Sequence, residues 1–191
     1  MKSNAIIAGV DEVGRGCLAG PVVSAAVILN NDIDLNPIKD SKKISFNQRI
    51  EVASYIKDNS FYAIGEASVE EIFSLNILQA SLLAMKRAIN NLAKKPEQIF
   101  IDGPFAPKGL ENCKTFIKGD EKIKCISAAS IVAKVHRDLL MIKLSEKFKN
   151  YSWEKNFGYG TKAHLEGLKK HGITNHHRKS FKPIHNILLK K

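Results

Sequence analysis

The sequence has few cysteines and no long apolar run. Its three cysteines, Cys17, Cys113 and Cys125, are odd in number and lack CxxC spacing. This argues against a disulfide scaffold or a cysteine zinc site and fits a reducing compartment. No segment approaches the roughly 20 apolar residues of a transmembrane helix, and the apolar segment after Lys2 is too short for a secretory signal. We therefore expect a cytoplasmic protein without a membrane partner.

Acidic residues are scarce relative to basic ones. The 191 residues include 30 Lys and Arg against 19 Asp and Glu, which gives a formal net charge of +11. Such an excess favours a polyanionic partner, although charge alone does not distinguish nucleic acid from an acidic membrane surface. The length and the 44% hydrophobic share predict one domain over residues 1–191, with a basic C-terminal extension from about residue 150 packed on it.

The segment from Ile6 to Gly16, IIAGVDEVGRG, joins a buried strand to charged residues. Apolar residues come first, then the adjacent carboxylates Asp11 and Glu12, then Gly14-Arg15-Gly16. Acids at a core-like strand end are costly unless a metal ion or a paired base compensates their charge. Glycine leaves backbone N–H groups unhindered and arginine adds a permanent cation, which suits a phosphate or a sugar. The segment therefore predicts an acidic site beside an anion-binding loop.

The hydrophobic pattern predicts a layered α/β domain, because strands and helices follow one another without a regular βα repeat. The expected strands cover residues 6–10, 21–29, 61–67, 98–101 and 115–118, and the expected helices cover 45–57, 68–93, 127–148 and 162–170. Capping boxes begin at Ser45 and Ser68, and Asn76 is a candidate cap for a second segment. Either Ser127 or Ser130 is expected to cap the helix that ends near residue 148. The first two strands can form a hairpin.

Four acids share a local setting at or just after an expected strand end, beside glycine or a turn: Asp11, Glu12, Asp102 and Asp120. If those ends lie side by side, mutual repulsion requires divalent cations to neutralise the cluster. Oxygen-only ligands select Mg²⁺ or Mn²⁺ over zinc. Two such ions about 4 Å apart can support phosphodiester cleavage. For any one acid the alternative is an ordinary turn residue or helix cap, and Asp120 in a charged turn is the weakest alone.

Over nearly its whole length the chain resembles the bacterial ribonuclease HII family, the type 2 ribonucleases H. The segments that carry the resemblance are DEVGRG (11–16), LAGPVV (18–23), DSKK (40–43), ASVEEI (67–72), LNILQASLLAMKRA (75–88), IDG (101–103), KGD (118–120), SAASIVAKVHRD (127–138), GYGTKAHLEGLKKHG (158–172) and HRKSF (177–181). Each is modest alone, and their order and spacing make the combination specific.

The resemblance implies a ribonuclease H-like mixed-sheet layer domain with flanking helices and a C-terminal helical extension. It also implies a metal-dependent endonuclease that hydrolyses the RNA strand of RNA–DNA hybrids and incises 5′ of ribonucleotides embedded in duplex DNA. The products are a 3′-hydroxyl and a 5′-phosphate. The four acids would hold two Mg²⁺ or Mn²⁺ ions, with Asp11 bridging them. We expect a monomer without an obligate protein partner.

The resemblance also assigns substrate contacts. Gly14, Arg15 and Gly16 would read the ribose 2′-hydroxyl, the group that distinguishes RNA from DNA. Tyr159 would meet the deoxyribose that follows the ribonucleotide. Further contacts to the phosphate backbone are expected from Ser41, Lys42, Lys43, Ser130 and Lys134. The residues alone leave other interpretations open: a plain flexible turn for residues 14–16, a ring plugging its own turn for Tyr159, and a solvated loop for residues 40–43.

Several charged residues have a structural interpretation instead. Arg137 and Asp138 are expected to form an ion pair, so Asp138 is not expected to be a metal ligand. Arg178, Lys179 and Lys182 are expected to contact DNA away from the cut. The C-terminal histidines lack a tight ligand pattern and cysteine partners, which disfavours a zinc site.

Two alternatives remain: a sister enzyme family with similar chemistry, and a binding module of a different class. A ribonuclease HIII-like hybrid nuclease would carry an additional N-terminal domain and lack the arginine of the GRG motif, whereas Arg15 is present and the first strand is expected close to Met1. A non-catalytic basic nucleic-acid-binding module would not need four acids, because acids at a phosphate site repel DNA without metal.

Overall fold

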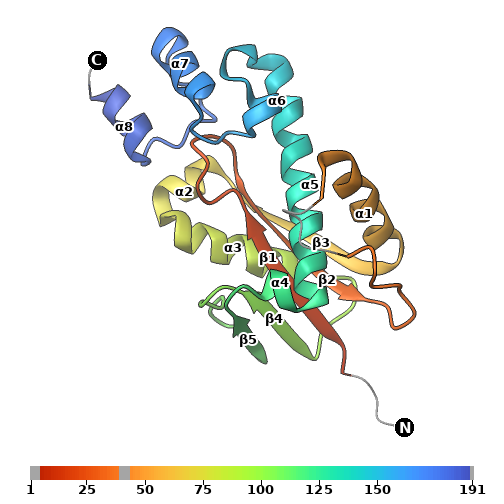
Figure 1. Ribbon diagram of the computed structural model, residues 1–191. Coiled ribbons are helices and arrows are strands. Elements are labelled where there is room, and N and C mark those ends of the chain that lie inside the picture. Colours follow the sequence, from red (N-terminus) through yellow and green to blue (C-terminus); the bar gives the residue numbers. More distant parts are fainter. Residues whose placement is uncertain (1–4, 39–43, 190–191) are drawn as a thin grey trace.

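The first two apolar segments of the chain pair as an antiparallel hairpin at the centre of a five-stranded mixed sheet. A computed structural model describes residues 5–38 and 44–189 (Figure 1). In chain order the strands are β1 (Ile7–Val13), β2 (Val22–Leu29), β3 (Ser60–Ala67), β4 (Gln98–Asp102) and β5 (Cys113–Phe116). The spatial order is β3-β2-β1-β4-β5. Strands β1, β4 and β5 run parallel, and β2 is antiparallel to both neighbours. The expected α/β layer fold is confirmed.

Helices cover both faces of the sheet, which explains why β2 reads as an unbroken apolar run. The helices are α1 (Phe46–Asp58), α2 (Val69–Leu75), α3 (Ile77–Asn90), α4 (Gly119–Lys122), α5 (Lys124–Lys147), the 3₁₀ turn η1 (Lys149–Tyr151), α6 (Trp153–Asn156), α7 (Lys162–His171) and α8 (Lys182–Leu188). Ala25 and Val27 of β2 pack in one cluster with α1 and α5. Ala26, between them, packs with α3.

Helix α5 lies unusually close to β1, and one glycine makes this approach feasible. A Cβ at Gly9 would lie 2.1 Å from the carbonyl carbon of Cys125, at the start of α5. Any larger side chain would push the helix away from the strand that carries Asp11 and Glu12. The long helix therefore crosses the sheet directly against β1 (Figure 1).

Helix boundaries follow the expected caps except at α5. Ser45 and Ser68 both form capping boxes, and Asn76 caps α3 with a φ of 68°, which separates α3 from α2. The expectation that Ser127 or Ser130 caps the long helix is wrong, because α5 begins at Lys124. The Ser127 hydroxyl instead donates to the Asp120 carbonyl at 2.5 Å. Ser127 therefore turns back from inside the helix to the segment before it.

The C-terminal segment builds its own apolar cluster around the end of α5. Leu18, Met141, Trp153 and Leu168 belong to this cluster, and α6, α7 and α8 gather at that end of the molecule (Figure 1). The expected helix after Tyr159 is confirmed as α7, with Thr161 at its N-cap. Within residues 5–38 and 44–189, no helix has the length and apolarity that a membrane crossing requires.

Candidate active site

The four candidate acids border one cavity. Asp11 and Glu12 lie near the end of β1, Asp102 is the last residue of β4, and Asp120 lies in α4 just after β5. Because β1, β4 and β5 are parallel neighbours, their carboxyl ends meet at one edge of the sheet. All four side chains line a cavity of about 350 Å³. The structure therefore brings together acids that are more than a hundred residues apart in sequence.

Asp11 is the least exposed of the four acids, and its ionised form is disfavoured. It is 6% exposed, and burial raises its pKa well above the usual range, reinforced by the negative charges of Glu12 and Asp102. The Glu12 backbone N–H donates to Asp11 Oδ1 at 2.7 Å, and a hydrogen bond from the Ser130 side chain also favours the ionised form. These hydrogen bonds lower the pKa of Asp11 by less than burial and the neighbouring charges raise it.

Glu12 is balanced by the neighbouring loop. Burial raises the pKa of Glu12, while the Arg15 guanidinium opposes this rise. Arg15 Nη1 lies 3.1 Å from Glu12 Oε1. The arginine of the GRG motif therefore contacts a carboxylate of the acidic cluster directly.

Asp102 and Asp120 are joined through the turn between them. Asp102 Oδ1 accepts a hydrogen bond of 2.7 Å from the Gly119 backbone N–H, immediately before Asp120. Lys118 adopts the left-handed conformation with φ 56° and ψ 44°, which starts the short helix that carries Asp120. The Ser127 hydroxyl holds the Asp120 carbonyl from α5. The main chain around Asp120 is thus fixed from both β4 and α5.

The donor chemistry of this cluster suits a hard divalent cation. All four groups are carboxylates, and burial together with the neighbouring negative charges raises the pKa of Asp11 and of Glu12. Among the described residues, however, no three His, Cys, Asp or Glu side chains are arranged so as to hold one metal ion. Asp102 contacts Gly119 and Glu12 contacts Arg15 instead. To bind a metal ion, Asp102 and Glu12 would therefore have to give up their contacts with Gly119 and Arg15.

The GRG loop and Tyr159 border the same cavity. Gly14 has a φ of +93°, which turns the chain sharply after β1. A Cβ at Gly16 would lie 3.9 Å from Cε1 of the Tyr159 ring, so the loop and the ring face each other. Tyr159 is 41% exposed. The two segments expected to read neighbouring sugars therefore lie side by side at this cavity, next to the acids.

The expected phosphate contacts are only partly described. Ser130 and Lys134, one turn apart on α5, line the cavity. Lys134 Nζ lies 2.7 Å from Asp138 Oδ1 and 4.8 Å from the centre of the Phe157 ring. Ser41, Lys42 and Lys43 lie outside the described residues.

Two expectations about basic residues are wrong. Asp138 pairs with Lys134, and its other carboxylate oxygen lies 3.8 Å from Arg49, so Arg137 is not its ion-pair partner. Arg178, expected to contact DNA, is fully buried and donates to three backbone carbonyls. Lys179 and Lys182 are exposed as a DNA contact requires.

Two buried histidines form a hydrogen-bonded pair that the sequence did not reveal. The Thr174 N–H donates to His177 Nδ1 at 2.9 Å, so His177 carries its proton on Nε2 and donates it to His164 Nε2 at 3.1 Å. His164 Nδ1 then donates to the Tyr159 carbonyl at 2.9 Å. Trp153 Nε1 also donates to His164 Nε2. Both rings are therefore neutral, and together they hold the backbone of Tyr159.

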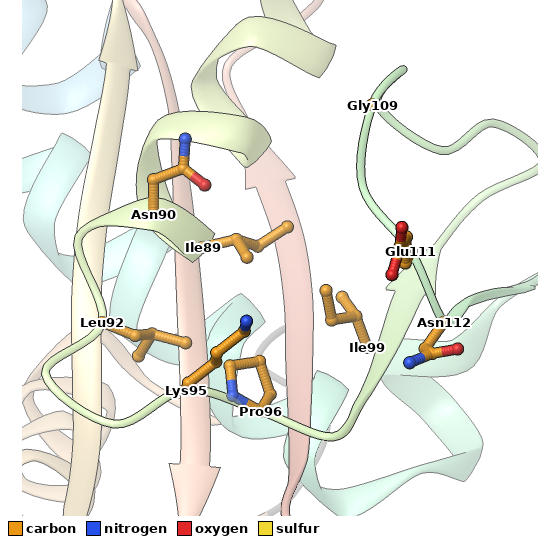
Figure 2. A pocket seen from close by; sticks show the side chains of 9 residues that line it. All are labelled: Ile89, Asn90, Leu92, Lys95, Pro96, Ile99, Gly109, Glu111 and Asn112. Carbon is orange, nitrogen blue, oxygen red and sulfur yellow. The ribbon is translucent and has the colours of Figure 1, made fainter.

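A larger cavity, of about 640 Å³, lies elsewhere. It borders the end of α3, the start of β4 and the loop before β5, and Figure 2 shows Ile89, Leu92 and Ile99 around it with Lys95 and Glu111. Ile99 is near the start of β4, whereas Asp102 is its last residue. This cavity contains none of the candidate site residues, so size does not identify the active site.

The family model and the curated relatives agree on one family. The family model described as Ribonuclease HII matches residues 8–184. Ribonuclease HII of Pelagibacter ubique (strain HTCC1062) is 58% identical over 185 residues, covering 96% of this chain and 99% of that protein. Ribonuclease HII of Coxiella burnetii (strain Dugway 5J108-111) is 48% identical over 188 residues, covering 98% and 93%. The ribonuclease H2 crystal structure from Pyrococcus horikoshii OT3 superposes with a TM-score of 0.80 at 28% identity, covering 96% and 97%.

Proposed function

The chain belongs to the ribonuclease HII family and is a ribonuclease H that acts on RNA–DNA hybrids, and we propose that it also incises duplex DNA 5′ of single embedded ribonucleotides. One observation carries this proposal: the four acids, the GRG loop and Tyr159 line the same cavity. Cutting groups and sugar-reading groups in one place can couple the cut to the sugar that occupies the site.

We propose that Asp11, Glu12, Asp102 and Asp120 hold two Mg²⁺ or Mn²⁺ ions. When bound, the ions neutralise the carboxylates, polarise the scissile phosphate and activate water. The raised pKa values of Asp11 and Glu12 support this role, because a cation stabilises their ionised forms. Water is delivered to the phosphorus on the 5′ side of the ribonucleotide, and the products are a 3′-hydroxyl and a 5′-phosphate.

The chain's own residues orient the substrate. Gly14 and Gly16 let backbone groups approach the ribose 2′-hydroxyl without side-chain obstruction. Arg15 supplies a cation beside Glu12. Its guanidinium can therefore contact the sugar–phosphate backbone next to the acidic cluster. The half-exposed Tyr159 ring packs against the next sugar, which fits a deoxyribose because it lacks the 2′-hydroxyl.

Lysine and serine side chains outside the acidic cluster contact the phosphate backbone. On α5, Ser130 and Lys134 border the cavity, and Lys134 is oriented by Asp138 and the Phe157 ring. Ser41, Lys42 and Lys43 are proposed to contact phosphates near the cut. The net charge of +11 adds a sequence-independent attraction that salt weakens.

A single-ribonucleotide nicking assay tests the proposal. The protein is incubated with a labelled DNA duplex that contains one ribonucleotide, with Mg²⁺ and separately with Mg²⁺ plus excess chelator. We expect one nick on the 5′ side of the ribonucleotide, extendable by a DNA polymerase from its 3′-hydroxyl and abolished by the chelator. Matched controls are the same duplex in all-DNA form and the uniform RNA–DNA hybrid. Cleavage of the hybrid alone would refute the incision, and a nick that survives chelation would refute the metal assignment.

A further inference from the structure

Two fully buried arginines lie behind the sugar-reading side of the cavity. Arg137 comes from α5 and Arg178 from the segment between α7 and α8, and each is 0% exposed. Within the described part of the chain, every hydrogen bond of both guanidinium groups ends on a backbone carbonyl. Arg137 donates from Nε to Pro21 at 3.0 Å, from Nη1 to Phe157 at 2.8 Å and from Nη2 to Ala19 at 2.9 Å.

Arg178 binds the same loop from another direction. Its Nε donates to Gly20 at 2.9 Å, its Nη1 to Arg15 at 3.0 Å and its Nη2 to Pro21 at 3.1 Å. The Pro21 carbonyl thus accepts from both guanidinium groups, and the Arg15 carbonyl lies inside the GRG motif. Together the two arginines bind the loop from residue 15 to residue 21 at four carbonyls.

This arrangement is costly as a means of stabilising a fold. Burying a cation without an opposite charge carries a large desolvation penalty. Burial and, second to it, the neighbouring charge of Arg137 lower the pKa of Arg178 to about 9. An apolar side chain would fill such a position without this penalty. The guanidinium groups therefore point to a requirement for fixed geometry, which a planar fork with several donors can meet.

Arg137 connects the segment that follows the GRG motif with the segment that carries Tyr159. Two of its donors bind Ala19 and Pro21, and the third binds Phe157, two residues before Tyr159. The Leu18 N–H also donates to the Gly158 carbonyl at 2.8 Å. A Cβ at Gly14 would lie 2.2 Å from Arg137 Nε, so the first glycine of the motif makes room for this guanidinium. The Arg137 side chain and the hydrogen bond between Leu18 and Gly158 thus both tie the segment after the GRG motif to the segment that carries Tyr159.

We propose that Arg137 and Arg178 are positioning residues that hold the GRG loop and Tyr159 at the separation of two neighbouring sugars, and so determine selectivity for a ribose followed by a deoxyribose. Both are buried, so neither touches the substrate. The acids are placed independently by the ends of β1 and β4 and by α4. Loosening the arginines is therefore expected to impair the choice of site more than the cutting itself. This inference rests on the proposed incision at single ribonucleotides.

The test compares two substrates in Arg137→Lys. Lysine keeps the charge and loses the fork that reaches three carbonyls. Incision rates are measured on a duplex with one ribonucleotide and on a uniform RNA–DNA hybrid of the same sequence, with kcat and KM determined for each. We expect the ratio of kcat for the single ribonucleotide to kcat for the hybrid to fall about tenfold to a hundredfold, since hydrogen bonds from a charged group are lost and the reacting groups are misplaced.

Two further variants keep the interpretation clear. Arg178→Lys leaves the contact between Arg137 and Phe157 intact, so we expect the same ratio to fall by a smaller factor. Arg87→Lys is the matched control: Arg87 binds the Glu66 carbonyl and the Glu71 carboxylate outside the cavity, and we expect its ratio to equal that of the wild type. Thermal melting of each variant is recorded in parallel.

The outcomes distinguish a failure of the proposed incision from a failure of the positioning role. Failure of the wild type to incise single ribonucleotides would overturn the proposed function, and the positioning role with it. Wild-type incision with an unchanged ratio in both cavity variants would overturn the positioning role alone. A parallel fall of both activities, or unfolding of both lysine variants, would make the arginines general supports of the fold and would also refute it.

Discussion

Two regions border the cavity, and each gathers buried groups of one charge. At the edge of the sheet, Asp11 and Glu12 repel each other and Asp102, and burial raises the pKa of the first two. Behind the GRG loop, Arg137 and Arg178 repel each other as well, yet carbonyl oxygens surround both. The cationic region is compensated from within the chain. In the acidic region the chain's own donors, Arg15 at Glu12 and the Gly119 N–H at Asp102, compensate the carboxylates only in part, because the pKa of Asp11 stays well above its usual range. An external cation is proposed to supply the remaining compensation.

The comparison also distinguishes the residues proposed for cleavage from those proposed to select the site of cleavage. Strand ends place the acids, so their geometry depends on sheet register and changes little with the loops. Hydrogen bonds from distant side chains place the GRG loop and Tyr159. Substitutions in the acidic cluster should remove catalysis. Substitutions behind the GRG loop and Tyr159 should alter the selectivity for a single ribonucleotide or the dependence of stability on pH.

The largest effect is expected from Asp11→Asn. Loss of a carboxylate from the acidic cluster should lower cleavage of an RNA–DNA hybrid by about a thousandfold or more, while binding of the hybrid changes little. In the absence of metal the same change removes the buried carboxyl group whose pKa is raised by burial and by Glu12 and Asp102, and it should raise the free energy of unfolding near neutral pH. Turnover and urea unfolding in the presence of chelator check both parts. Asp32→Asn, on the exposed loop after β2, is the control, and near-normal turnover of Asp11→Asn would contradict the assignment.

A smaller effect is expected from acidification of the histidine pair. Burial and the charge of His164 lower the pKa of His177 to about 3, against roughly 6.5 in the unfolded chain. Between these values the unfolded chain binds the proton and the native state does not, so this contribution to stability is present above pH 6.5 and lost as the pH falls toward 3. At pH 5 the loss is about 2 kcal/mol.

Urea unfolding of metal-free protein at pH 7.5 and pH 5 measures this loss. His177→Gln should flatten the pH dependence, and His185→Gln, at an exposed position, should leave it unchanged. The acidic region should respond in the opposite direction, because protonation of Asp11 relieves its repulsion. Equal pH slopes for His177→Gln and the wild type would show that the pair does not titrate as described.

The smallest effect is expected from Tyr159→Ala. Loss of one ring that packs against a sugar should lower incision at a single ribonucleotide by about tenfold, while binding of the duplex changes by less. Tyr62→Ala provides a matched control, because Tyr62 is 40% exposed and Tyr159 41%, but Tyr62 lies on the edge strand β3. Gel-based nicking and equilibrium binding report the two quantities. An equal fall in both would make Tyr159 a general contact without a role in selection.

The gathering of the four acids could be inferred from sequence because its signals are local. An apolar strand followed by Asp11 and Glu12, and a second strand ending on Asp102, predict acids at one sheet edge once the strands are parallel. Asp120 is the weakest of the four by sequence, because it lies in what could be a plain charged turn. In the structure its place depends on a left-handed Lys118 and on a hydroxyl from α5. Neither feature has a short-range signature.

The contacts of Arg137 and Arg178 behind the GRG loop could not be inferred in the same way. Arg137 and Asp138 are adjacent in sequence, and an ion pair was the simplest expectation. Consecutive helical residues point in different directions, and the structure pairs Asp138 with Lys134 and leaves Arg137 to carbonyls. Arg178 lies in a basic run that resembles a DNA contact, and only tertiary packing shows that it is buried.

The bond from Arg178 to the Arg15 carbonyl has a consequence for the order of folding. Its partners lie 163 positions apart along the chain, and the contact from Arg178 to Gly20 spans 158. Contacts of such separation form late, since the intervening chain must be ordered before they close. On the ribosome, β1 to β5 emerge well before residue 178. The carboxylate edge should therefore mature first, and the enzyme should gain its discrimination only when the last quarter of the polypeptide docks.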